Sequence, residues 1–256
     1  MTPESISSPD TRDAGPRSHD AQRPGRRGPK QRLSTAAVVD AAIALADASG
    51  VAALSMRKVA EMVGVSPMSL YTYVPSKAEL IDLMLDGILA KTADPDETMT
   101  GWREKLAFIA HERWALSERH PWLLDLALHR PPLGPNVMRK AQVMLSAMEG
   151  MGLEPEDAGM AAETLQNYIT GALRAARDAR EARELSGLTD EQWFATVGSE
   201  MQKHLDPQSF DAVRRISEAK LRQARSPTER ATRFAFGLER VLDGLDLYIR
   251  ERRPPA

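Results

Sequence analysis

Apolar residues recur at helical spacing along most of the chain, and no stretch alternates between apolar and polar residues as a strand does. Residues 34–49 place their apolar side chains on one helical face, and Ser34 stands where it caps the first turn. The same pattern predicts a second helix over 55–63 and a third over 66–74, each opened by a serine. We therefore expect three short helices before residue 75.

The second and third of these helices are joined by a tight turn. Gly64 follows the second helix, and glycine adopts at little cost the left-handed conformation that such a turn requires. Pro67 lies in the first turn of the third helix, where its missing N–H needs no partner. A helix, a three-residue turn and a short helix form the helix-turn-helix arrangement, whose second helix enters the major groove of DNA.

A fourth helix is expected after Pro75, which ends the third. Ser76 and Glu79 form a capping box at its start, and apolar residues follow at helical spacing until Asp94. Seven further helices are expected beyond it, at about residues 100–119, 121–129, 135–150, 155–184, 189–204, 207–223 and 227–251. The chain is therefore expected to be all-α, with the fourth helix as a lever between a small basic unit and a larger body.

The composition agrees with a helical, globular protein. Hydrophobic residues make up 42% of the chain, and helix-favouring residues outnumber the aromatic and β-branched types that favour strands. The absence of cysteine excludes disulfides, thiolate metal sites and a cysteine nucleophile. No apolar run approaches the roughly 20 residues of a membrane span, and the start of the chain does not resemble a signal peptide. We expect a soluble, cytoplasmic protein without a membrane partner.

Charge is distributed unevenly along the chain, whose formal net charge is −2. Residues 23–77 contain eight Lys or Arg but only three Asp or Glu, which indicates a polyanionic partner for this part. Residues 1–32 are rich in Ser, Pro, Gly and Arg and are expected to form a disordered basic arm. In this arm Arg26, Arg27 and Lys30 are expected to contact phosphates or the minor groove, and a solvated tail is the alternative.

Catalytic or metal-binding chemistry finds little support in the sequence. The five histidines lack the spacing of HExxH or another metal motif, and no glycine-rich phosphate-binding loop occurs. The carboxylates Glu154, Glu156 and Asp157 lie at a helix start, where the helix dipole accounts for them. We therefore expect no catalytic residues, no metal site and no cofactor, and an enzyme is the disfavoured alternative to a regulator.

Two of the later helices carry apolar seams. Leu165 and Ala172 belong to the seam of the helix over 155–184. Leu238, Val241 and Leu245 belong to a stripe in the last helix that alternates steps of three and four residues, as in a coiled coil. The two helices either pack within one subunit or pair with their copies in a four-helix interface between two subunits. We expect the second arrangement, a homodimer.

The segment that carries the helix-turn-helix also carries a family resemblance. The strings SMRKVAEMVGVS at 55–66 and LYTYVPSKAEL at 70–80 resemble the N-terminal DNA-binding domain of the tetracycline-repressor (TetR) family. The body is similar, more loosely, to the C-terminal domain of the tetracycline-repressor branch, notably in HPW at 120–122, FGL at 236–238 and LDGL at 242–245.

The resemblance implies a particular organisation and function. A helix-turn-helix DNA-binding domain over residues 33–78 would be followed by a ligand-binding and dimerisation domain over 79–253. The protein would be a homodimeric repressor whose two third helices enter successive major grooves of a near-palindromic double-stranded DNA operator. A small-molecule effector in the body would shift the fourth helix and release the DNA. A DNA-binding activator, or a regulator without a ligand, is the alternative, because the sequence does not separate these cases.

The family's DNA contacts can be carried over by position. They fall on the second helix, on the third helix with its exposed hydroxyls, and on the start of the fourth, where a lysine would contact a phosphate. The residues implied are Arg57, Pro67, Met68, Ser69, Tyr71, Thr72, Tyr73 and Lys77. Leu70 and Val74 are expected instead to be core.

The family's ligand site is not preserved in this chain. The tetracycline repressor holds its drug and a magnesium ion with an imidazole, an asparagine, a glutamine and an aromatic ring. By position, Ile109 replaces the asparagine, Arg113 the aromatic and Met144 the glutamine, which argues against tetracycline–magnesium recognition. A largely apolar pocket is expected, with Arg113 suited to a planar carboxylate if it faces inward. The residues expected to line it are Ile109, Met144 and Met148, with Arg113, His129 and Glu163 as polar anchors. Ordinary core packing is the alternative for the two methionines.

Overall fold

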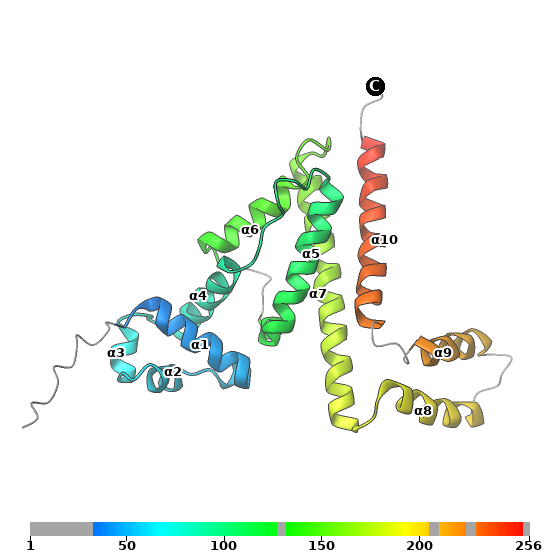
Figure 1. The fold of residues 1–256 in the computed structure, drawn as a ribbon, viewed down its shortest axis with the longest axis horizontal. Helices are drawn as coiled ribbons and strands as arrows, with labels where there is room; N and C mark the ends of the chain where they lie inside the picture. The colour runs from blue at the N-terminus through cyan, green and yellow to red at the C-terminus, as the bar shows by residue number, and fades with distance from the viewer. Residues whose placement is uncertain (1–32, 127–131, 205–209, 224–228, 253–256) are drawn as a thin grey trace, which may run out of the picture. The chain divides into compact units, whose positions relative to one another are not determined.

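The computed structural model describes residues 33–126, 132–204, 210–223 and 229–252, and every regular element in these ranges is helical (Figure 1). These residues belong to one compact unit, 33–256. The expectation of an all-α fold is thus confirmed for the described chain. The basic arm expected over 1–32, with Arg26, Arg27 and Lys30, lies outside the described residues.

Serine side chains begin the helices of the N-terminal part, as the sequence predicts. The elements are α1 (Thr35–Ser49), the 3₁₀ turn η1 (Val51–Ala53), α2 (Met56–Met62), α3 (Pro67–Tyr71) and α4 (Lys77–Ala90). The side chains of Ser34, Ser55, Ser66 and Ser76 each accept a hydrogen bond from the backbone N–H three residues later, at 3.1–3.3 Å. Each bond satisfies a donor that the first helical turn would otherwise leave free.

The turn between α2 and α3 is built around Gly64, which has a φ of 71°. The Val65 N–H donates to the Ala60 carbonyl at 3.0 Å, and the Gly64 N–H donates to Glu61 at 3.3 Å. These two bonds form the Schellman motif, in which the residue after the helix, here Gly64, has a left-handed backbone conformation. Glycine is therefore required at this position, because other residues adopt that conformation at a cost.

Helix α3 is shorter than the expected 66–74, because the last of these residues precedes a proline. Pro75 disfavours the helical conformation for Val74. The chain closes instead through turns in which the N–H groups of Tyr73 and Val74 donate to the Leu70 carbonyl, at 2.9 and 3.1 Å.

The remaining elements form the body. They are α5 (Trp102–Arg119), the 3₁₀ turn η2 (Pro121–Asp125), α6 (Pro135–Ser146), α7 (Pro155–Ser186), α8 (Asp190–His204), α9 (Asp211–Gln223) and α10 (Glu229–Arg252). The expectation of an α-helix over 121–129 is wrong for the part that the structure describes, 121–126, where a 3₁₀ turn forms over Pro121–Asp125. This turn buries Trp122 and Leu123 against the N-terminal helices.

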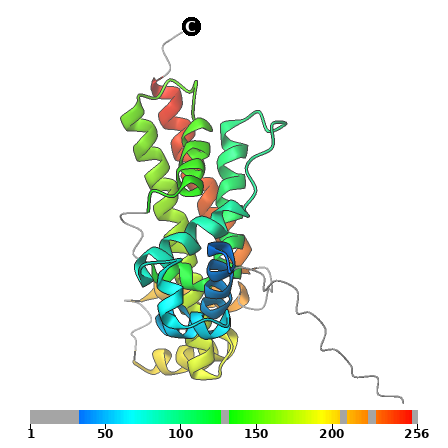
Figure 2. The ribbon, with the colours of Figure 1, turned by 90° about the vertical axis from the view of Figure 1, so that its left-hand side faces the viewer.

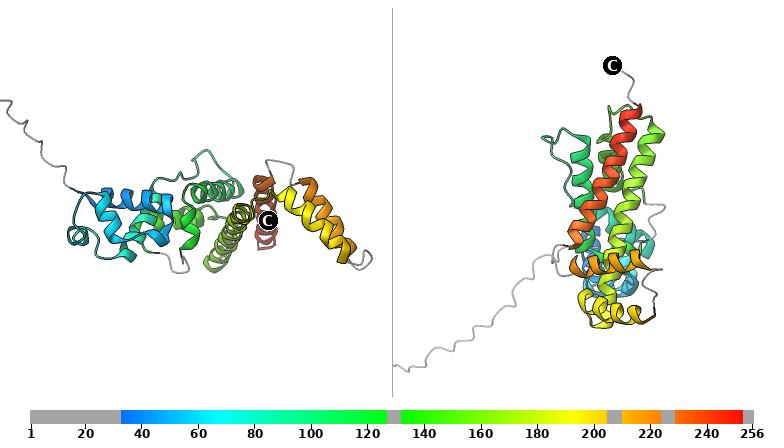
Figure 3. Two further views of the ribbon diagram at one scale, coloured as in Figure 1. Left: turned by 90° about the horizontal axis from the view of Figure 1, so that it is seen from below. Right: turned by 90° about the vertical axis from the view of Figure 1, so that its right-hand side faces the viewer.

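Two apolar cores organise the described chain. The first joins α1–α4, which Figure 2 shows in blue and cyan, to the buried side chains of Leu116, Trp122 and Leu123. The second lies between α5, α6, α7 and α10, where α7 and α10 run side by side (Figure 3). Helix α4 contacts both α1 and α6, so it links the two parts.

Candidate nucleic-acid interface and effector pocket

The short helix α3 presents one face to the first core and the other to solvent. Leu70 and Val74 are completely buried, which confirms their assignment to the core. All eight side chains expected to contact DNA are exposed: Arg57, Pro67, Met68, Ser69, Tyr71, Thr72, Tyr73 and Lys77. Seven of them lie on α3 or within a few residues of it, whereas Arg57 lies on α2.

The hydroxyl groups on this surface are not equally free. The Thr72 hydroxyl donates to the Ser69 carbonyl at 2.7 Å, and the hydroxyls of Ser66 and Ser69 lie 2.9 Å apart. Arg57 forms an exposed ion pair with Glu61 at 3.0 Å. Within the described chain, the hydroxyls of Tyr71 and Tyr73 have no hydrogen bond and are available to a ligand.

Helix α4 carries a carboxylate that caps another helix. The Asp86 carboxylate accepts hydrogen bonds from the Asn136 N–H at 2.8 Å, the Asn136 side-chain amide at 2.8 Å and the Val137 N–H at 3.1 Å. These groups open α6, whose own N-cap residue, Gly134, has no side chain to do so. A Cβ atom at Gly134 would overlap the Asp86 carboxylate, so the cap requires glycine there.

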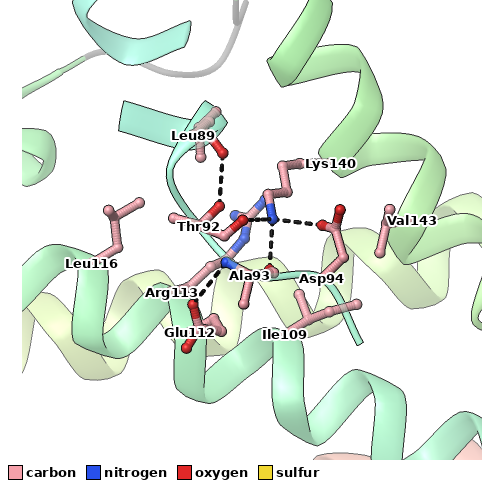
Figure 4. Close-up of a pocket in the computed structure, with 10 residues that line it drawn as sticks. All are labelled: Leu89, Thr92, Ala93, Asp94, Ile109, Glu112, Arg113, Leu116, Lys140 and Val143. Carbon is pink, nitrogen blue, oxygen red and sulfur yellow. Dashed lines mark hydrogen bonds and ion pairs between the residues drawn. The ribbon is translucent and has the colours of Figure 1, made fainter. Parts of the chain in front are cut away.

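Helix α6 in turn caps the C-terminal end of α4. The Lys140 ammonium donates to the carbonyls of Thr92 at 3.0 Å and Ala93 at 2.6 Å, and it pairs with Asp94 at 2.6 Å (Figure 4). Arg139 donates to the Leu89 carbonyl at 3.2 Å and also pairs with Asp94. Cations at a helix C-terminus satisfy its free carbonyls and oppose its dipole. Helices α4 and α6 therefore cap each other.

A small cavity lies beside this reciprocal cap. It is lined by Leu89, Thr92, Ala93, Asp94, Ile109, Glu112, Arg113, Leu116, Lys140 and Val143 (Figure 4). The space open to the centre of a water molecule is about 30 Å³, enough for one or two waters. A whole organic effector would need the cavity to open.

Of the five expected pocket residues that the structure describes, Ile109 and Arg113 line this cavity. Met144 and Met148 are buried in the second core and do not line it. Glu163 is exposed on α7, and His129 lies outside the described residues. Met144, Met148 and Glu163 do not line this cavity, and their contact with a ligand stays a prediction. Helical periodicity identifies an apolar face, but not whether a cavity or close packing covers it.

Sequence reasoning missed three charged groups in this cavity: Asp94, Glu112 and Lys140. The only available signal was Asp94-Pro95, which we interpreted as the end of the fourth helix. Lys140 lies 46 residues after Asp94 in the chain, and no local sequence pattern predicts a contact between the two.

Arg113 has an unusual environment for a cation. Its guanidinium donates to the Gln166 side chain on α7. Burial disfavours the charged form and lowers the pKa of Arg113 to about 10. Across the described ranges, no carboxylate lies within ion-pair distance of Arg113.

A second contact joins the N-terminal helices to the body. The Asp47 carboxylate at the end of α1 accepts a hydrogen bond from the Trp122 indole N–H at 2.7 Å. The same carboxylate oxygen lies 2.7 Å from Nδ1 of His120. The HPW sequence thus has a structural use, which is to hold α1 against η2.

The seams of α7 and α10 face each other inside one subunit. Leu165 and Leu238 are completely buried in the second core, and Ala172, Val241 and Leu245 are half-buried against it. The Tyr168 hydroxyl reinforces this contact by donating to the Phe234 carbonyl at 2.7 Å. These five residues thus contribute to the core of the subunit. The homodimer interface expected at them stays a prediction, because an apolar seam is equally consistent with either partner.

Comparison with protein families identifies the class of molecule. Residues 38–84 match the family described as "Bacterial regulatory proteins, tetR family", and residues 94–249 match "Tetracyclin repressor-like, C-terminal domain". The chain therefore belongs to the tetracycline-repressor (TetR) family. It is a helix-turn-helix transcriptional regulator, and its relatives are regulators rather than enzymes.

Individual relatives agree with this assignment. The HTH-type transcriptional repressor DrrR1 of Streptomyces coeruleorubidus is 38% identical over 235 residues, which cover 91% of this chain and 85% of DrrR1. The structure of SCO7222, a TetR from Streptomyces coelicolor, is similar with a TM-score of 0.66 and 25% identity, covering 87% of this chain and 100% of that one. The structure of ActR from the same organism, in complex with actinorhodin, is similar with a TM-score of 0.67 and 25% sequence identity. The match covers 85% of this chain and 98% of the ActR chain.

Within the described ranges, no helix combines the length and apolar character needed to cross a membrane. Over the same residues, no group of three or more His, Asp or Glu side chains is arranged to hold a metal ion.

Proposed function

We propose that this chain represses transcription as a homodimer bound to a palindromic operator, and that a small organic effector releases it. The observation that carries the proposal is the reciprocal capping of α4 and α6. Asp86 on α4 caps the start of α6, and Arg139 and Lys140 on α6 hold the end of α4 and the residues that follow it. This reciprocal capping joins the helix that follows the DNA-binding surface to the helix that lines the cavity. A repressor of bacterial genes acts where the chromosome lies, so we place it in the cytoplasm.

The exposed surface of α3 suits contact with a DNA groove. Tyr71 and Tyr73 offer unpaired hydroxyls, and Lys77 offers a cation for a phosphate at the start of α4. Met68 and Ser69 extend the same surface toward base edges, and Arg57 adds a charge from α2. We keep the boundary of the DNA-binding domain at residue 78, and we keep the basic arm over 1–32 as a further contact.

The cavity provides a route from effector to DNA. Three of its lining residues, Thr92, Ala93 and Asp94, are the groups that Lys140 holds at the end of α4. An effector that widens the cavity must change this cap and, with it, the angle of α4. It releases DNA only if it binds the altered arrangement more tightly than the operator-binding one. The similarity to ActR, solved with actinorhodin, supports an organic effector for this chain.

Each helix of the expected dimer interface also has an exposed face. On α10, Phe236 and Leu247 are 64% and 60% exposed and lie eleven residues apart, on one side of the helix. On α7, Met160 and Gly171 have the same separation and are also exposed. We propose that these faces, rather than the buried seams, meet in a second copy of the chain.

The experiment is a selection of bound duplexes from a random pool with the purified full-length chain. A palindromic consensus, with half-sites about one helical turn apart, supports the dimeric regulator. A mobility-shift titration with extracts of small molecules then tests for release. Specific binding that no compound weakens favours a ligand-independent regulator, and a reporter that rises with the protein favours an activator. The absence of any consensus rejects the proposal.

A further inference from the structure

We infer that the effector carries an anionic group, a carboxylate or an ionised hydroxyl, and that the Arg113 guanidinium is its counter-ion. The inference rests on the proposed function of the cavity as the effector site. It names the chemistry that the cavity selects.

The position of Arg113 carries the argument. Its side chain comes from α5, lines the cavity and is held by the Gln166 side chain on α7. A neutral amide fixes a guanidinium in place without neutralising its charge. Arg113 therefore reaches the cavity oriented and uncompensated, as far as the described residues are concerned.

The other charged groups of the cavity already have partners. Lys140 is paired with Asp94, which Arg139 shares, so this lysine already has a counter-ion. The Glu112 carboxylate accepts a hydrogen bond from the Ala93 N–H at 3.3 Å, at a partly exposed position where water screens it. Arg113 is partly buried and, in the described ranges, has no carboxylate partner, and a partly buried charge interacts more strongly with an incoming ion than one in water does.

The shape of a guanidinium selects among anions. Its parallel N–H groups match two oxygens in a plane, which a carboxylate provides and an enolate or phenolate partly provides. The cavity has room for a group of about this size, since its volume would admit one or two waters. Its walls at Leu89, Ile109, Leu116 and Val143 are apolar, so the anionic group should belong to an apolar scaffold.

The first test needs no ligand. A partly buried charge without a counter-ion destabilises the empty protein, so we expect Arg113→Met to raise the melting temperature of the ligand-free chain by about 2–4 °C. The control is Arg174→Met on an exposed part of α7, which should leave the melting temperature unchanged. A fall on Arg113→Met would make the arginine a structural link to Gln166 and would overturn the inference.

The second test compares three probes of one shape: naphthoate, its carboxamide and naphthylmethylamine. Calorimetric titration should show that the wild-type chain prefers naphthoate to the carboxamide by about tenfold or more. Arg113→Met should abolish that preference, whereas Glu112→Gln should preserve or increase it. A preference for the amine, weakened by Glu112→Gln, would identify a cationic effector and overturn the inference, as would equal binding or no binding of all three probes.

Operator binding by the ligand-free wild-type chain tests the proposed regulatory function separately from the anionic character of the effector. If a specific duplex is bound but the probes are not discriminated, only the anionic effector is rejected. If no duplex is bound specifically, the proposed function fails, whatever the probes show.

Discussion

The Asp86 carboxylate on α4 accepts both the backbone and the side-chain amide hydrogens of Asn136, at 2.8 Å each, and so opens helix α6 from another helix. Removing it with Asp86→Ala should lower the free energy of unfolding by about 1 kcal/mol, the usual cost of losing an N-cap. Because the angle of α4 is then less well fixed, operator affinity should also fall several-fold. Chemical denaturation and a mobility-shift titration measure the two effects.

Two variants control this prediction. Asp82 is exposed on the same helix and has no hydrogen bond in the described chain, so Asp82→Ala should change neither quantity. Gly134→Ala should reproduce the loss from the opposite side, because the added Cβ displaces the Asp86 carboxylate. If Asp86→Ala is as stable as Asp82→Ala, the cap contributes nothing.

The other half of the reciprocal cap is Lys140, which holds the carbonyls of Thr92 and Ala93. Lys140→Met should cost about 1–3 kcal/mol, because the carbonyls of Thr92 and Ala93, just after α4, lose hydrogen bonds from a mostly buried ammonium group. Lys91→Met is the matched control, since Lys91 forms an exposed ion pair with Asp40 that is worth less than about 1 kcal/mol. Denaturation curves with equal losses for the two variants would contradict the assigned role.

The N-terminal helices could be predicted because their signals are local. The side chains of Ser34 and Ser66 accept hydrogen bonds from N–H groups three residues later in the chain. The turn at Gly64 is closed by hydrogen bonds within residues 60–65. The sequence alone contains both partners of each such bond side by side. Helix α3 was overestimated only at its end, where Pro75 and the tertiary packing of Val74 decide the boundary.

The pocket and the seams could not be predicted in the same way. Lys140 and Asp94 meet across 46 residues, and Arg113 and Gln166 across 53, so only the packing of the helices brings them together. The period of Leu238 and its neighbours correctly indicates a buried stripe. It carries no information about whether α7 of the same chain or a second subunit covers it.

Two residues of the exposed surface test the DNA interface. Tyr71→Phe removes a hydroxyl that is unpaired within the described chain, so specific binding should weaken by about 1 kcal/mol, or roughly fivefold, without loss of stability.

Lys77→Ala should weaken binding to all duplexes alike. It should reduce the slope of log affinity against log salt by about two, because each subunit of a dimer loses one phosphate contact.

The controls for this interface lie on the body. Lys105→Ala on α5 should leave the salt slope unchanged, since this lysine belongs to the helical body. Thermal unfolding of each variant verifies that the N-terminal helices remain folded. An unaltered salt slope for Lys77→Ala would remove this residue from the interface.

The exposed face of α10 gives the last prediction. Leu247→Glu and Phe236→Glu place a charge on side chains that are mostly exposed in one subunit, so each subunit should stay folded while the dimer dissociates. Leu238→Glu buries its charge in the core and should unfold the subunit instead. Leu185→Glu, near the end of α7, is the control for an exposed leucine outside this face. Sedimentation equilibrium and circular dichroism distinguish the outcomes, and a folded dimer in both α10 variants would place the interface elsewhere.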